Sequence, residues 1–190
     1  AKGEYIQKHA LGLKHPALAL TYNSLGQTFK KQGDSKSTFK YFSNALDIAD
    51  ESLGKNHPLY ATICLNLGQL CKDSNEEEDA LLFFKKAEMI QEETLGNHPD
   101  LAKTYNEMAS TFRKIGDCQE ALAYNKKALK IREETLPKNH LELAQSKNNV
   151  GKCYLSKGMD DLALKNFVVA LEIYKNKDVD RESLANVYLN

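Results

Sequence analysis

The sequence predicts an all-α protein built from repeated pairs of helices, and two observations lead to this prediction. Apolar residues recur with the 3.6-residue period of amphipathic helices, without the alternation typical of strands, and the 190 residues include only 4 prolines and 10 glycines. A histidine that is followed by proline in three of its four copies recurs at positions 15, 57, 98 and 140, with spacings of 42, 41 and 42 residues. Self-similarity at such a period is typical of helical repeat proteins.

Each repeat is predicted to hold two helices, which we call helix A and helix B. Helix A begins after the His-Pro pair, because proline suits the first position of a helix. It ends near Gly33, Asn75, Gly116 or Gly158, which tolerate the left-handed conformation at a helix C-terminus. Helix B then runs to a Leu-Gly or Leu-Pro pair, for example over 119–136. Small or apolar residues recur in register: Gly26, Gly68, Ala109 and Gly151; Ala45, Ala87, Ala128 and Ala170; Ile48, Ile90, Ile131 and Ile173.

The stretches GQTFKKQGDSKSTFKYFSNAL (26–46) and ASTFRKIGDCQEALAYNKKAL (109–129) resemble the tetratricopeptide repeat. The usual unit of that family has 34 residues, whereas these repeats have 41 or 42, with a longer helix B. In this respect they are similar to the kinesin light chain and nephrocystin type. The resemblance implies a right-handed superhelical solenoid of antiparallel helix pairs, in which the A helices line a concave groove that binds peptides.

The repeats predict a single array over residues 1–190. Residues 1–13 align with the end of a helix B, and residues 181–190 with the start of a further helix A. That last segment would expose Leu184, Val187, Tyr188 and Leu189, which favours an alternative role as a structural or self-associating spacer that joins head to tail. The four complete repeats are expected at 14–55, 56–96, 97–138 and 139–180.

Composition excludes several classes of function. Lys+Arg and Asp+Glu number 26 each, so no net charge draws the chain to nucleic acid or membrane. Neither a signal peptide nor an apolar run of about 20 residues is visible, and the four cysteines form no CxxC pair, which predicts a reduced, cytoplasmic protein. Enzyme motifs are absent, and the histidines lie one per repeat, too far apart to share a metal. We therefore expect no catalysis, cofactor or metal.

A polar face recurs on the A helices, at three positions set by the small residue of each repeat and at positions next to them. Its amides can bind a peptide backbone of any sequence, and its cations can attract carboxylates. Leu65, with Leu20 nearby, predicts an apolar spot, so the expected ligand is an acidic peptide with one hydrophobic anchor. Kinesin light chains are similar in recognising such cargo peptides. A merely solvated face, repeated by common descent, remains the alternative. The candidate groove residues are Asn23, Gln27, Lys30, Leu65, Asn66, Gln69, Lys72, Asn106, Arg113, Asn148, Asn149 and Lys152.

Overall fold

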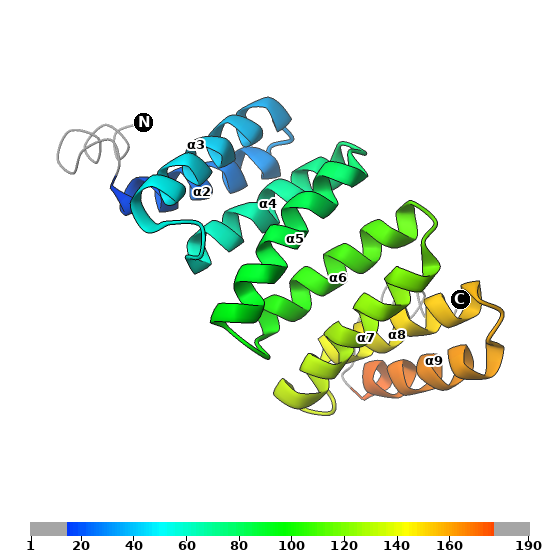
Figure 1. The fold of residues 1–190 in the computed structure, drawn as a ribbon. Helices are drawn as coiled ribbons and strands as arrows, with labels where there is room; N and C mark the ends of the chain where they lie inside the picture. The colour runs from blue at the N-terminus through cyan, green and yellow to red at the C-terminus, as the bar shows by residue number, and fades with distance from the viewer. Residues whose placement is uncertain (1–14, 177–190) are drawn as a thin grey trace. The chain divides into compact units, whose positions relative to one another are not determined.

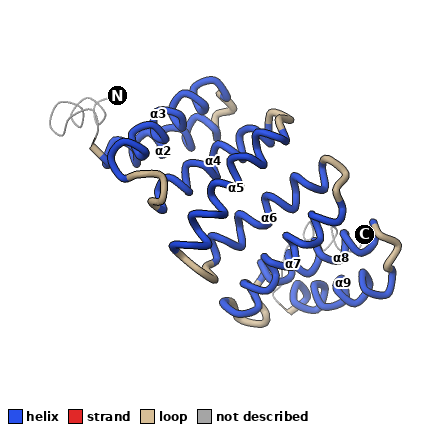
Figure 2. Tube along the Cα trace, in the orientation of Figure 1, coloured by secondary structure: helices blue, strands red, loops and turns tan. Residues whose placement is uncertain are grey.

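The computed structural model describes residues 15–176 and divides the chain into two compact units, 1–96 and 97–190. The division falls at the predicted boundary between the second and third repeats. Within the described residues every regular element is a helix, as Figures 1 and 2 show. The expectations for 1–13 and 181–190 lie outside the described residues, and the single continuous array stays a prediction.

The first unit contains two helix pairs, each an A helix followed by a B helix. Helix α2 packs against α3 and α4 against α5, while α3 also contacts α4 and the two A helices touch each other. The predicted pairing of helices within repeats is thus confirmed here. The bounds are α2 Pro16–Lys31, α3 Ser35–Leu53, α4 Pro58–Asp73 and α5 Glu77–Thr94.

The second unit repeats this arrangement. Helix α6 packs against α7 and α8 against α9, and α7 contacts α8. Helix B of the third repeat, expected over 119–136, is observed one residue earlier at each end. The bounds are α6 Pro99–Lys114, α7 Cys118–Thr135, α8 Leu141–Ser156 and α9 Asp160–Lys175.

The recurring histidine is the N-cap of every A helix. In each copy the imidazole Nδ1 accepts a hydrogen bond from the backbone N–H two residues later, at 3.0 to 3.2 Å. Three of these helices carry proline at their first position, where its missing N–H leaves no bond unmade. The interpretation of the histidines as helix-entry residues is confirmed, and their chemistry is that of a cap. The four N-caps are His15, His57, His98 and His140.

The predicted ends of the A helices are confirmed by backbone geometry. Gly33, Asn75, Gly116 and Gly158 all have positive φ, between 61° and 87°. Asn75 is the one non-glycine residue in this conformation among the described residues, and asparagine is one of the few side chains that tolerate it. Each A helix therefore turns into its B helix through a left-handed residue.

Helix A approaches helix B closely at the glycine of three of the repeats. A Cβ added to Gly26, Gly68 or Gly151 would lie 2.5–2.6 Å from the ring of a phenylalanine on helix B. The third repeat departs from this pattern, because Ala109 replaces the glycine and Asn125 stands where the other copies have phenylalanine. The smaller Asn125 side chain leaves room for the Cβ of Ala109. The phenylalanines of the other copies are Phe42, Phe84 and Phe167.

Candidate functional site

In the first unit two predicted groove asparagines bind each other. The Nδ2 of Asn66 on α4 donates a hydrogen bond to Oδ1 of Asn23 on α2 at 2.8 Å, and both side chains are only 8% exposed. The sequence placed them on a face opposite the core, but the structure places them between adjacent A helices. Each amide keeps further donor or acceptor capacity, so the pair can join the two helices and still hydrogen-bond another group.

The basic residue at the end of α2 is also paired. Lys30 Nζ lies 3.0 Å from Asp73 Oδ2 at the end of α4, while Gln27 is exposed. Leu65 is only 5% exposed, so it offers a ligand little surface, whereas Leu20 is 55% exposed. The predicted apolar spot therefore depends on Leu20. The remaining candidates of this unit, Gln69 and Lys72, are half-buried.

The second unit brings four predicted groove residues to one small pocket of about 100 Å³. Helix α6 contributes Asn106, Ser110 and Arg113, and α8 contributes the other two predicted residues. A residue that the sequence analysis did not select, the buried Asn125 of α7, completes the lining. Asn148 does not line this pocket: it is 7% exposed, and its Oδ1 is buried without a hydrogen-bond partner. The two α8 residues in the lining are Asn149 and Lys152.

The pocket is electrostatically positive. Burial and the neighbouring Arg113 both lower the pKa of Lys152, burial being the larger cause. Within residues 15–176 neither cation forms an ion pair with a carboxylate. Two like charges that share a partly desolvated pocket disfavour each other, and an anion between them would relieve that repulsion.

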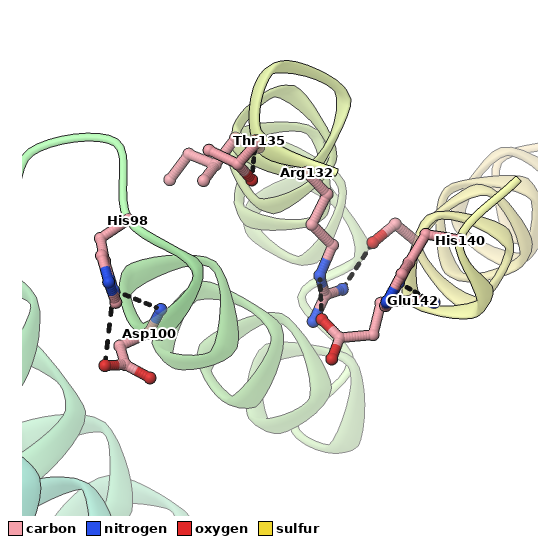
Figure 3. Close-up of polar contacts among 8 residues, drawn as sticks. His98, Asp100, Arg132, Thr135, His140 and Glu142 are labelled. Carbon is pink, nitrogen blue, oxygen red and sulfur yellow. Dashed lines mark hydrogen bonds and ion pairs between the residues drawn. The ribbon is translucent and has the colours of Figure 1, made fainter. Parts of the chain in front are cut away.

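A buried arginine connects three helices of the same unit. Arg132 of α7 is 5% exposed; its Nη1 donates to Ser146 Oγ at 2.5 Å, and its Nε lies 3.3 Å from Glu142 Oε2 (Figure 3). The Asn106 amide turns its oxygen to the guanidinium, because the NH₂ group would face other donors, and accepts from Nη1 and Nη2 at 2.5 and 2.9 Å. Burial lowers the pKa of Arg132, and Glu142 opposes that shift.

Sequence reasoning missed this arginine, although the aligned repeats contain a signal for it. The equivalent positions hold Ala49, Gln91 and Tyr174, all of them buried. A cation at a position that is otherwise buried requires buried partners. Asn106 is thus a structural acceptor as well as a pocket residue.

The cysteines act mainly as core residues. Cys64, Cys71 and Cys153 are buried, and Cys118 is half-buried. Burial raises the pKa of Cys64 to about 12 and that of Cys71 to about 11, which disfavours the reactive thiolate. The interpretation of the buried thiols as core residues is therefore supported by the structure.

Comparison with known proteins agrees with this architecture. The family model described as tetratricopeptide repeat matches residues 18–93, 88–134 and 100–176, which together cover more than half of the chain. No curated protein sequence matches the chain. None of the helices over residues 15–176 is both long and apolar enough to cross a membrane.

Solved structures of low sequence identity share the fold. BtubC (BKLC) from P. vanneervenii is 21% identical, with a TM-score of 0.81 over 88% of this chain and 67% of that one. The nearly identical TPR-like repeats of Podosopora anserina, described as those of a kinesin light chain, are 19% identical, with a TM-score of 0.77 over 92% and 87%. The apo form of RapI is 18% identical, with a TM-score of 0.80 over 90% of this chain and 46% of that one.

Proposed function

Because the chain belongs to the tetratricopeptide repeat family, whose repeats are generally non-catalytic scaffolds for protein interaction, we propose that it binds an extended peptide along its A helices. The observation that carries this proposal is the pocket of the second unit, where side chains of α6 and α8 converge. The proposed ligand is acidic, because Arg113 and Lys152 have no carboxylate partner among the described residues.

The backbone of the peptide is expected to meet amide side chains. An amide group both donates and accepts, so it can bind a peptide group irrespective of sequence. Asn149 lines the pocket, and Asn23 and Asn66 keep capacity beyond their mutual bond. On the first unit, the exposed Leu20, one turn before Asn23 on α2, is the proposed contact for a hydrophobic anchor. The proposed location is the reducing cytoplasm, as the sequence predicts.

The experiment is a fluorescence anisotropy titration with a library of acidic peptides that each carry one aromatic residue. Arg113→Glu is expected to weaken the best peptide at least about tenfold, because it replaces an attraction by a repulsion. Lys165→Glu on the exposed side of α9 is the matched control, with the same charge change and no expected effect. Asn106→Ala is unsuitable alone, because it also removes an acceptor of Arg132.

Two results would contradict the proposal. The first is a library without any saturable binder, and the second is equal weakening by Arg113→Glu and Lys165→Glu, which would reveal a nonspecific charge effect. If no peptide binds while light scattering shows association that rises with concentration, the self-associating spacer becomes the better account.

A further inference from the structure

The pocket of the second unit occupies positions that have direct counterparts in the first unit. Each lining residue lies 83 positions after its counterpart, as Arg113 does after Lys30, because two repeats separate them. The two sets of residues differ in side-chain size and in charge. The counterparts are Asn23, Gln27, Lys30, Phe42, Asn66 and Gln69.

One difference concerns the floor of the pocket. Phe42 of α3 is fully buried and lies directly under Gly26. Its counterpart Asn125 is smaller and polar, is 5% exposed, and donates a hydrogen bond from Nδ2 to Cys153 Sγ at 3.3 Å. Exchanging a phenyl ring for an amide therefore leaves a hollow, and it gives that hollow a fixed, polar floor.

A second difference concerns charge. In the first unit Lys30 pairs with Asp73, and Gln69 is neutral, so the three positions sum to zero. Their counterparts in the second unit are Arg113, Ser156 and Lys152. The acid has become a serine, whose hydroxyl donates to the backbone oxygen of Lys152 at 3.0 Å, and the amide has become a second cation. The same positions therefore carry two positive charges and no acid.

We propose that this pocket binds one oxyanion group of the peptide ligand, either the carboxylate of an acidic residue or the phosphoryl group of a phosphorylated one. The guanidinium of Arg113 and the ammonium of Lys152 supply charge-assisted hydrogen bonds, and the amide of Asn149 and hydroxyl of Ser110 supply neutral ones. A volume of about 100 Å³ equals only a few water molecules at about 30 Å³ each, so the pocket admits one such group.

This proposal rests on the proposed function for the nature of its ligand, but small anions test the site without any peptide. The experiment is an NMR titration of the isotopically labelled full chain with sodium phosphate and, separately, sodium acetate, at an ionic strength held constant with sodium chloride. The expected result is saturable shifts at Ser110, Arg113, Asn149 and Lys152 for at least one of the two anions. Saturation by acetate assigns the site to carboxylates, and saturation by phosphate assigns it to phosphoryl groups.

The decisive variant restores the first unit's packing. Ala109→Gly with Asn125→Phe recreates the glycine–phenylalanine pair of the other three repeats, so it is expected to fold, and it fills the pocket while keeping both cations. Saturable shifts should disappear in this variant. Arg113→Gln with Lys152→Gln should weaken anion binding at least about tenfold, whereas Lys30→Gln in the first unit should leave it unchanged.

Three results would overturn the proposal: shifts that grow linearly with both anions, shifts equal to those in sodium chloride alone, or saturation that survives the filled pocket. Each of them is distinct from failure of the proposed function. A chain that binds a small anion in this pocket but no library peptide contradicts peptide binding and keeps the site, while a peptide binder without saturable anion shifts contradicts the site alone.

Discussion

The two units share one backbone plan but differ in what their facing A helices present. In the first unit the amides of Asn23 and Asn66 bind each other, and Lys30 is neutralised by Asp73. In the second unit Asn106 turns to Arg132, and Arg113 and Lys152 have no acidic partner among the described residues. A repeat can thus exchange the chemistry of this face while the starts of all its helices and the ends of its A helices are kept.

The units differ again between helix B of one repeat and helix A of the next. The first unit holds Ala49 and Ile63, both fully buried, where the second holds Arg132 and Ser146. The residues of the first unit are apolar and need no hydrogen-bond partner. Those of the second unit belong to a hydrogen-bonded network, in which each polar group needs its partners. The difference predicts unequal sensitivity to substitution.

The largest expected effect follows from removing the centre of that network. Arg132→Ala should lower the free energy of unfolding by about 3 kcal/mol, because it opens a cavity and leaves the buried hydroxyl of Ser146 without its donor. Adding Ser146→Ile, which completes the apolar pair of the first unit, should recover part of that loss. Urea denaturation followed by circular dichroism measures both. No loss for the single variant would mean that the network contributes nothing to stability.

A smaller effect is expected at the close approach of helices A and B. Gly68→Ala places a Cβ 2.5 Å from the Phe84 ring and should cost about 2 kcal/mol by overpacking. Ala109→Gly, at the equivalent position of the third repeat, where Asn125 replaces the phenylalanine, should cost about 1 kcal/mol, the helix propensity of glycine. Thermal unfolding of the two variants compares them. A smaller loss for Gly68→Ala than for Ala109→Gly would show that the close approach to the Phe84 ring does not limit the size of this residue.

The amide pair is expected to contribute less. Asn23→Ala removes the acceptor of a buried Asn66 donor and should cost about 1 kcal/mol. Asn148→Ala is the matched comparison, since its buried Oδ1 has no hydrogen-bond partner, and it should leave stability unchanged or raise it by about 0.5 kcal/mol. The same denaturation series measures both, and equal losses would contradict a structural role for the pair.

The smallest effect concerns the pocket cations and depends on pH. Burial and Arg113 lower the pKa of Lys152 in the folded chain, so the charge of Lys152 destabilises the fold below that pKa. This destabilisation fades as the pH rises from the pKa of the folded chain to the higher pKa of the unfolded chain. Lys152→Gln should therefore raise stability by about 0.3 kcal/mol at neutral pH, after allowance for solvent screening. The gain should vanish at alkaline pH. A gain that grows with pH instead would contradict the assigned shift.

Much of the fold was predictable because its signals are local. The His-Pro pair at the start of a helix A and the left-handed residue after its end, such as Gly33 or Gly116, are signals in the sequence next to that helix. The spacing of the copies gives the number of helix pairs among the described residues. The burial of Asn23 and Asn66 was not predictable in this way. The periodicity of one helix separates its apolar face from the rest, but it does not distinguish solvent from a neighbouring helix.

The site was predictable in part for a related reason. Arg113, Asn149 and Lys152 were found because they stand at polar positions that recur between repeats. Arg132 and Asn125 were not predicted because they stand at positions that face inward in the other copies, where the repeat pattern indicates only packing residues. Both are visible as departures from the repeat, so comparing buried positions between copies would have found them.

The most direct test of peptide binding by the A helices is a map of where the best library peptide shifts the amide resonances of the ¹⁵N-labelled chain. The account predicts saturable shifts on α6 and α8, centred on Arg113, Asn149 and Lys152. Shifts confined to the B helices α3, α5, α7 and α9, with α6 and α8 unchanged, would contradict it.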